Sequence, residues 1–296
     1  MKRNKVQSQK KEFFSNRRIA MLSVALVAII VLSFLIFRFF VQPSEVKFSF
    51  KAAIIDQIGE TYPSSTASAK EFNETVTNLL RNAGFSVFYY ESKSVTVNFY
   101  KELAKNNYGL IILRAHSALR QNETLVDFFT SEEFREDAHI DERNCGWLTM
   151  GSFSWEPDKF YFAITPKFIE NLEGYFPKSI IIAMGCNSLN QSCTEMAEAF
   201  MKKGAKAYIG WTSAVGMSYS DNSTMNFLRY FLAENMTINE AINKCNKIPD
   251  PEGYYGKLAC YPSAIGCYKL PDFAADVVLS ALFVKKQKYA ILKIAA

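Results

Sequence analysis

The sequence predicts an α/β domain built as a three-layer sandwich with a mainly parallel sheet, preceded by one transmembrane helix. Two patterns support this prediction: short apolar runs alternate with segments of helical periodicity, and one long uncharged run lies near the N-terminus. Strands that are buried on both faces form continuous apolar runs, and the helices between them cover both faces of a parallel sheet.

Residues 19–41 form the predicted membrane anchor. Residues 19–37 carry no charge, and the apolar run continues beyond Arg38 through Phe39 to Val41. A helix needs about 20 apolar residues to cross the hydrocarbon core of a bilayer. A cleaved signal peptide would have an apolar region of about 7–15 residues that ends at small residues. Because this run is longer and ends in bulky residues, we expect an uncleaved anchor.

Charge predicts the orientation of the anchor. Residues 1–18 carry seven Lys and Arg and a single acid, Glu12, so this tail is expected in the cytoplasm and residues 48–296 outside the cell membrane. The whole chain has 34 basic and 29 acidic residues; residues 1–38 hold eight of the former and one of the latter, which leaves 26 and 28. The folded part therefore lacks a basic excess, and no nucleic-acid partner is expected.

Potential modification sites fit an exterior location. Five Asn-x-Ser/Thr triplets predict a glycoprotein if the domain lies in a secretory or surface compartment; they begin at Asn73, Asn122, Asn190, Asn222 and Asn235. Six cysteines could form disulfides in an oxidising compartment, although the sequence leaves their pairing open; they are Cys145, Cys186, Cys193, Cys245, Cys260 and Cys267. The last two form a plausible local pair.

The first third of the domain alternates between strands and helices. Runs of apolar, β-branched and aromatic residues predict the strands, and apolar residues at helical spacing predict the helices. Gly84 ends the first helix, because glycine accepts the left-handed geometry found there. The expected elements are strand 52–55, helix 67–82, strand 85–90, helix 97–105 and strand 110–113.

Residues 114–159 lack clear periodicity and are expected to form an irregular connection, of the length that is usually functional or mobile. The alternation then resumes with strand 160–164, helix 166–172, strand 179–184, helix 194–203, strand 207–211 and helices 223–233 and 238–245. Periodicity is weak after residue 249, where 277–282 and 289–294 are predicted as late strands.

Two chemically capable residues follow predicted strands. Strand 110–113 leads into His116, and strand 179–184 leads into Cys186. Ligands of open parallel sheets bind beyond the C-terminal ends of the strands. A cysteine nucleophile needs thiolate character and a nearby imidazole, and the helix that begins near Thr194 is expected to supply N–H groups to it. The second histidine, His139, lies in a charged segment and is expected at the surface.

Each residue also has an ordinary explanation. His116 could be a structural histidine at a strand end, and Cys186 could be a buried apolar residue or half of a disulfide. Their placement at the ends of two predicted parallel strands favours function over both. The other common site patterns that we sought, namely a Walker or dinucleotide fingerprint, a Gly-x-Ser-x-Gly elbow and a zinc site, are absent or weak.

The segments Leu113-Arg114-Ala115-His116-Ser117 and Ala183-Met184-Gly185-Cys186-Asn187-Ser188 resemble the motifs of the caspase-like (clan CD) cysteine peptidases. This group contains caspases, gingipains, legumain, separase and CHAT-domain proteases, and the second segment looks most like the separase form. The stretch from Glu198 to Trp211, with Phe227 and the segment 230–232 after it, is similar to CHAT domains. The resemblance covers about residues 50–247 and implies a caspase-like topology.

The resemblance implies roles for four residues. Cys186 would attack a peptide carbonyl to form an acyl-enzyme, and His116 would protonate the leaving amine and later activate water. Backbone N–H groups of Ser117 and Cys186 would form the oxyanion hole. Asp221 aligns with an acidic position that sets specificity in some relatives, which implies a basic P1 residue in a protein or peptide substrate. The chemistry needs no metal or organic cofactor.

Two positions differ from the family pattern. Ser117 stands where a glycine usually follows the histidine, and Leu189 stands where a glycine often follows the cysteine by three residues. Either change could narrow the oxyanion region. The alternative to an anchored cysteine endopeptidase is therefore a catalytically inactive caspase-like ectodomain that binds protein or scaffolds a surface complex. A third reading is an unrelated α/β binding protein in which His116 and Cys186 are incidental.

Overall fold

The computed structural model describes residues 30–33, 47–59, 66–120 and 125–275. The chain divides into two compact units, Met1–Val46 and Lys47–Ala296. Of the predicted anchor, only the helical turn at residues 30–33 belongs to the described part, and no described helix is long and apolar enough to cross a bilayer. The basic tail and the two late strands predicted after residue 276 also lie outside the described residues.

The second unit is built on a six-stranded sheet. Its strand order is β10-β9-β8-β3-β1-β2, and every neighbouring pair is parallel except β10 with β9. The strands are β1 (Lys51–Asp56), β2 (Ser86–Tyr90), β3 (Leu110–Arg114), β8 (Ile180–Ala183), β9 (Ala207–Trp211) and β10 (Leu258–Tyr261). The first five were predicted from the sequence. Burial on both faces explains the apolar runs of β1, β3, β8 and β9, whereas the edge strand β2 is largely exposed. The mainly parallel α/β fold is thereby confirmed.

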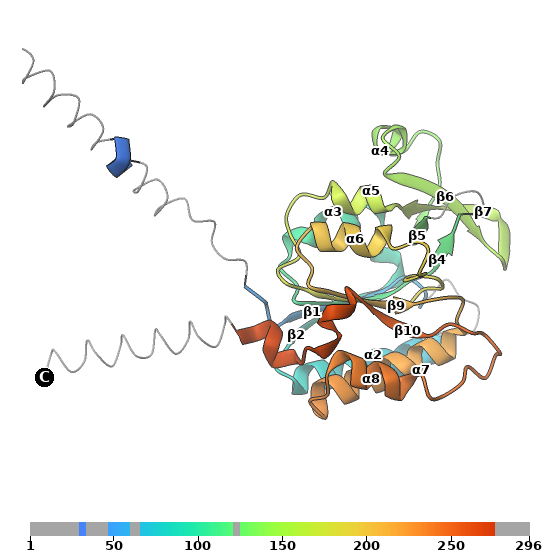
Figure 1. Ribbon diagram of the computed structural model, residues 1–296. Helices are drawn as coiled ribbons and strands as arrows, with labels where there is room; N and C mark the ends of the chain where they lie inside the picture. Colours follow the sequence, from blue (N-terminus) through green and yellow to red (C-terminus); the bar gives the residue numbers. More distant parts are fainter. Residues whose placement is uncertain (1–29, 34–46, 60–65, 121–124, 276–296) are drawn as a thin grey trace, which may run out of the picture. The chain divides into compact units, whose positions relative to one another are not determined.

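Helices cover both faces of this sheet, and each face has its own apolar core (Figure 1). One layer contains α2 (Thr66–Asn82), α7 (Met217–Leu228) and α8 (Ile238–Cys245). The other contains α3 (Val97–Glu102), α5 (Pro166–Glu170) and α6 (Glu195–Lys202). The predicted helix 223–233 begins earlier than expected, as α7, and ends as one π-helical turn, Arg229–Ala233.

The prediction for residues 114–159 was wrong. Instead of an irregular connection, the described residues form a second, antiparallel sheet in the order β4-β5-β7-β6, at the upper right in Figure 1. Its elements are β4 (Ser117–Leu119), β5 (Val126–Glu133), α4 (Ile140–Asn144), β6 (Leu148–Phe153) and β7 (Glu156–Ile164). The predicted strand 160–164 is the mostly buried half of β7, whose first half is exposed and charged. Its strands mix buried apolar residues with exposed or charged ones, so they lack the continuous apolar runs of the parallel sheet, which is why the second sheet was missed.

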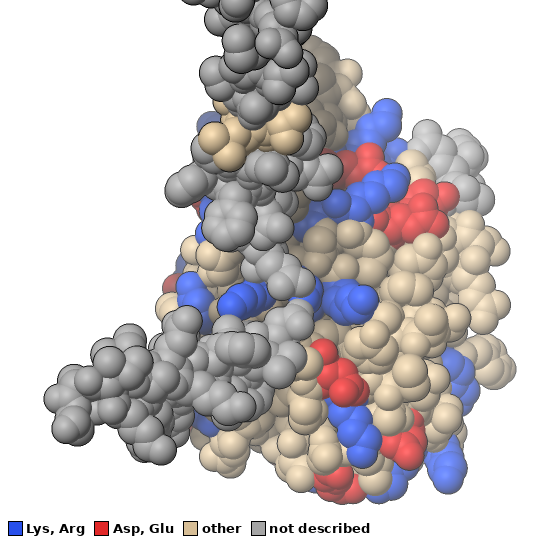
Figure 2. Space-filling model, turned by 60° about the vertical axis from the view of Figure 1, so that its left-hand side comes forward, with Lys and Arg blue, Asp and Glu red and all other residues tan. Residues whose placement is uncertain are grey.

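The face of the domain that is visible in Figure 2 mixes both signs of charge. Basic and acidic side chains lie among one another and among uncharged residues on the face shown in Figure 2, so its coloured part carries no broad area of one sign. Several exposed pairs are direct contacts, such as Lys202 with Glu170 at 2.6 Å and Lys244 with Glu234 at 3.1 Å.

Candidate active site

The ends of β3 and β8 bring His116 and Cys186 to the same edge of the sheet. The two strands are parallel neighbours, with Leu113 opposite Ala183. A Cβ on Gly185 would lie 2.6 Å from the carbonyl oxygen of Ala115 and 2.8 Å from the amide nitrogen of Ser117. The residues on either side of His116 therefore touch the residue before Cys186, and only glycine fits at this contact. If His116 and Cys186 were incidental, they would not need to follow adjacent parallel strands, as they do here.

His116 and Cys186 line one small cavity of about 50 Å³. Its walls come from the ends of β3 and β8, from the loop before α7 and from α7 itself, where Met217 and Asp221 face it. The expectation that the helix after Thr194 serves Cys186 was wrong, because none of the described residues that line the cavity belongs to α6. Met217, at the start of α7, lines the cavity instead, and the positive end of a helix dipole favours negative charge nearby.

The turn that carries Cys186 is held by hydrogen bonds to the next strand and its loop. Asn187 has a left-handed backbone (φ 57°), which asparagine tolerates, and its N–H donates to the carbonyl of Ser213 at 3.0 Å. The hydroxyl of Ser188 donates to Ala183 at 2.8 Å and accepts the N–H of Trp211 at 2.9 Å. The thiol of Cys186 lies 3.6 Å from the carbonyl oxygen of Val215. The sulfur is thus at a fixed place on the cavity wall.

His116 is held at its backbone by two hydrogen bonds. Its N–H donates to Oε1 of Gln57 at 3.0 Å, and its carbonyl accepts the N–H of Phe129 at 2.9 Å. The imidazole lies against aromatic rings, with centroid distances of 5.0 Å to Phe153 and 4.9 Å to Trp155. Its Nε2 is inaccessible to solvent and has no hydrogen-bond partner among the described residues.

Burial makes His116 a weak base. Removal of water from around the ring, with a smaller contribution from the positive charge of Arg114, lowers the pKa of His116 to about 4. An imidazole prefers its neutral form when it is desolvated. At neutral pH the ring is therefore uncharged and able to accept a proton from a neighbouring group.

The two departures from the family pattern have different consequences. The hydroxyl of Ser117 donates to the carbonyl oxygen of Cys186 at 2.6 Å, so this serine ties the two strand ends together. Leu189 is buried in the apolar core, where its N–H donates to Trp211 at 2.9 Å, and it is not among the residues that line the cavity. Neither Ser117 nor Leu189 is among the described residues that line the cavity of His116 and Cys186.

Asp221 faces the cavity, but its carboxylate is already bound. It is 3 % exposed, and Arg114 donates to both of its oxygens, from Nε to Oδ1 at 2.9 Å and from Nη2 to Oδ2 at 2.8 Å. The third arm of the guanidinium, Nη1, donates to Oδ1 of Asp56 at 2.6 Å. Sequence reasoning missed this buried ion network. The available signal was a charged residue, Arg114, at the end of an otherwise apolar strand.

His139 lies elsewhere, in the antiparallel sheet region, and the expectation of a solvated residue was wrong. Its side chain is 13 % exposed, its Nε2 lies 2.7 Å from Oε1 of Glu132, and its ring packs edge-on against Phe162 at 5.1 Å. The carboxylate partner and the aromatic contact leave His139 half-buried, although its sequence neighbours are charged. It is not among the residues lining the cavity.

All six cysteines and four of the five sequon asparagines lie within the described residues. All six cysteines have free thiols, Cys260 and Cys267 included, so Cys186 is no disulfide half in this structure. Within the described residues, no group of three or more His, Cys, Asp and Glu side chains could hold a metal ion. Of the sequon asparagines, Asn222 and Asn235 are exposed, Asn73 and Asn190 are half-buried, and Asn122 lies in the undescribed segment 121–124.

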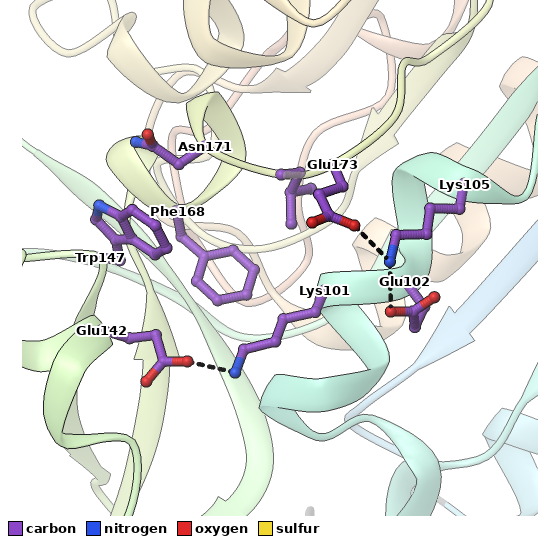
Figure 3. Close-up of a pocket in the computed structure, with 9 residues that line it drawn as sticks. Lys101, Glu102, Lys105, Glu142, Trp147, Phe168, Asn171 and Glu173 are labelled. Atoms are coloured by element: carbon purple, nitrogen blue, oxygen red, sulfur yellow. Dashed lines mark hydrogen bonds and ion pairs between the residues drawn. The ribbon is translucent and has the colours of Figure 1, made fainter.

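A second cavity, of about 330 Å³, lies apart from His116 and Cys186 and was not anticipated from the sequence (Figure 3). Trp147, Phe168 and Leu172 form its apolar wall. Ion pairs border it, Lys101 with Glu142 on one side and Lys105 with Glu102 and Glu173 on the other. The cavity is large enough for a side chain or a small ligand.

Comparisons with known proteins give matches at the level of structure alone. No protein-family model and no curated protein matches the sequence. Among solved structures, the chain is similar to the Arg-specific cysteine proteinase gingipain R, with a TM-score of 0.42 and 13% identity over 67% of this chain and 41% of that one. It is also similar to the Drosophila initiator caspase Dronc, with a TM-score of 0.36 and 9% identity over 72% of this chain and 80% of that one. The chain thus spans less than half the length of gingipain R. Both structures belong to the group that the sequence motifs indicated.

Proposed function

We propose that this chain is a membrane-anchored, extracytoplasmic cysteine endopeptidase that uses His116 and Cys186 as a catalytic dyad. One observation supports this above all others: two parallel strands end side by side, and the residues after them line a shared cavity. A thiol and a neutral imidazole at one cavity are the minimum for nucleophilic acyl transfer.

The reaction proceeds through an acyl-enzyme. His116 takes the proton of the Cys186 thiol as the sulfur attacks the peptide carbonyl carbon. The tetrahedral intermediate collapses, the C–N bond breaks, and His116 gives its proton to the leaving amine. Water then loses a proton to His116 as it attacks the thioester, and the C–S bond breaks to release the carboxylic acid and restore the thiol. Backbone N–H groups of Ser117 and Cys186 stabilise the negative oxygen in both steps.

We include Asp221 in the proposal as a residue that influences the choice of P1 side chain, although its carboxylate is already bound by Arg114. A basic P1 side chain would have to share Asp221 with Arg114, which already donates to both carboxylate oxygens. Two carboxylates, Asp56 and Asp221, surround one guanidinium, so the network keeps one negative charge in excess. That excess charge supports a preference for a basic over an acidic P1 residue.

The location outside a membrane rests on the sequence of the N-terminal unit. The uncharged run within residues 19–41 and the basic tail before it support an anchor with its N-terminus in the cytoplasm. Protease added to intact cells should remove the domain while leaving a short membrane-bound stub. A domain that stays intact until the membrane is permeabilised would contradict this orientation.

Cleavage of a peptide library by the detergent-purified full-length chain tests the catalytic proposal. Cys186→Ala should abolish turnover while the circular dichroism spectrum stays unchanged. The matched control is Cys267→Ala, which removes an exposed thiol that does not line the cavity. Undiminished cleavage by Cys186→Ala would exclude Cys186 as the nucleophile.

A binding function is the second candidate. The catalytic cavity of about 50 Å³ is small, whereas the second cavity of about 330 Å³ has an apolar wall and charged borders. An inactive ectodomain that binds protein would use the second cavity and would not need a reactive thiol. Partner binding that survives Cys186→Ala but is lost when Trp147 is replaced by Ala would favour it.

A further inference from the structure

Two aromatic residues at one hairpin turn cover the imidazole of His116. Phe153 ends β6 and Trp155 lies in the turn before β7, and we call this pair the aromatic clamp. The two rings stack at 4.9 Å with an interplanar angle of 5°. Each also contacts the imidazole, at 5.0 Å and 4.9 Å respectively. The clamp therefore forms one continuous apolar surface against His116.

The hairpin that carries the clamp packs against neighbouring aromatic residues of the same sheet. Phe153 packs on Phe129 at 5.0 Å and on Tyr161 at 4.8 Å, and together they form a small apolar core of their own. The register of β6 and β7 shifts between Ser152 and Phe153, an irregularity of the kind that re-aims side chains. The hydroxyl of Tyr161 donates to Glu156 at 2.9 Å, next to the turn. This support orders the clamp and makes it more than an exposed loop tip.

The clamp orients the imidazole of His116, a task that a polar partner usually performs for a catalytic histidine. An imidazole is commonly oriented by a hydrogen bond from one ring nitrogen to a carboxylate or a carbonyl. Here Nε2 has no such partner among the described residues and no contact with solvent. A buried polar atom without a hydrogen bond is unfavourable, and it persists only where packing holds it. The ring contacts supply that packing.

We propose that Phe153 and Trp155 are positioning residues of the active site, which hold the imidazole of His116 by ring contacts and exclude water from it. His116 then meets the substrate as a neutral base. The inference rests on the proposed function for its catalytic meaning, although the physical arrangement is measurable without any turnover.

The ionisable groups around His116 come from several elements. Arg114 lies two residues before it, and it is paired with both Asp56 and Asp221. Across the cavity lie Cys186 and Asp221, and on the clamp's side lie Glu156 and Tyr161, which bond each other. Because most of these charges are already paired, burial is the largest cause of the low pKa of His116, about 4. Removal of a clamp ring should let water in and raise that pKa.

Histidine NMR measures this effect directly, since the chain contains only two histidines, His116 and His139. The full-length chain in detergent micelles, labelled at histidine, is titrated as wild type, Trp155→Ala and Trp155→Phe. We expect the His116 midpoint to rise from about 4 toward the ordinary value of about 6.5 in Trp155→Ala and to stay low in Trp155→Phe. His139, which packs against Phe162 in another part of the sheet, provides the reference resonance in all three proteins.

A His116 midpoint that is the same in wild type and Trp155→Ala would overturn the inference. If Trp155→Ala fails to fold, Phe153→Leu removes the other ring and is read in the same way. The acid limb of kcat/KM gives a second readout: it should move upward with the NMR midpoint in Trp155→Ala and return in Trp155→Phe. A chain that cleaves no peptide would contradict the proposed function, while the NMR titration would still decide the role of the clamp.

Discussion

Arg114 and Asp221 stand 107 positions apart in the sequence and form a two-point ion pair in the interior of the domain. Both side chains are almost fully buried, as is Asp56, which takes the third arm of the guanidinium. The pair joins the end of β3 to α7, the two elements that flank the cavity of His116 and Cys186. The network therefore holds together the parts of the fold that build the candidate site.

Replacement of Arg114 by Leu should strongly destabilise the domain. It leaves two buried carboxylates, Asp56 and Asp221, without their countercharge. Loss of one partner from a buried ion pair costs about 3–5 kcal/mol, because the remaining charge is unpaired away from water. Urea unfolding of the wild type and Arg114→Leu, followed by circular dichroism, measures the difference in the free energy of unfolding.

Lys70→Met is the control for this experiment. Its ion pair with Glu74 is exposed, with 78% and 65% of the two side chains accessible, and pairs of this kind contribute about 0.3–0.5 kcal/mol. An Arg114→Leu variant that loses no more stability than Lys70→Met would show that the buried network has no structural role.

Stability should fall in acid because of His116. The folded protein binds a proton on this ring only near pH 4, whereas the unfolded chain binds it near pH 6.5. The unfolded state therefore takes up the proton first as pH falls. The contribution of His116 to stability is complete above pH 6.5 and is lost between 6.5 and about 4. At about 1.36 kcal/mol per pKa unit, it amounts to roughly 3 kcal/mol.

Unfolding free energies of the wild type and His116→Leu, measured from pH 7 to pH 4, check this expectation. The decline with acid should be shallower in His116→Leu, since that side chain has no proton to bind. His139→Leu serves as the matched control. Because it retains His116, the loss of stability that His116 causes in acid should still be present in this variant. Parallel curves for wild type and His116→Leu would contradict the burial of a neutral imidazole.

Gly185→Ala should push the turn of Cys186 away from the end of β3. The new Cβ would lie 2.3 Å from the hydroxyl of Ser117, 2.6 Å from the carbonyl oxygen of Ala115 and 2.8 Å from the amide nitrogen of Ser117. Overpacking of this kind costs about 1–3 kcal/mol. Both the free energy of unfolding and peptide cleavage should fall.

The double variant Gly185→Ala with Ser117→Ala identifies the atoms responsible. It removes the hydroxyl but leaves the two backbone atoms at 2.6 Å and 2.8 Å, so we expect little recovery of stability or activity. Full recovery in the double variant would show that the side chain of Ser117, and not the backbone contact between the strand ends, demands the glycine.

Thiol labelling should single out Cys186. We expect iodoacetamide at neutral pH to modify Cys186 first, because the neutral imidazole of His116 lines the same cavity and can accept the thiol proton as the sulfur reacts. Burial raises the pKa of Cys245 to about 11 and that of Cys260 to about 12, so both should stay unlabelled in the folded protein. Peptide mass spectrometry after short exposure gives the extent of labelling at each site.

The exposed thiols of Cys145 and Cys267 provide the reference rate, because they are accessible but do not line the cavity. In His116→Ala, labelling of Cys186 should drop to that reference rate or below it. Equal labelling of Cys186 in both proteins would separate the cysteine from the histidine and favour the binding function.

Local pattern was sufficient to predict five strands of the central sheet and to place His116 and Cys186 after strand ends. Strands β1, β3 and β8 are buried on both faces, and burial on both faces requires an uninterrupted apolar run that is visible in the sequence. The polar residue after such a run lies at the ligand-binding edge of the sheet, which is how His116 and Cys186 were found. The antiparallel sheet was missed because its strands mix buried apolar residues with exposed or charged ones.

The sequence by itself determined the α/β alternation, the two strand-end residues and the apolar N-terminal run, because each depends on neighbours a few positions apart. Tertiary structure alone decided what surrounds the site: the aromatic clamp on His116, the choice of α7 over α6 beside Cys186, and the capture of Asp221 by Arg114. These contacts join residues separated by tens of positions. Their formation depends on how whole helices and strands pack against one another, and a local sequence pattern does not predict that packing.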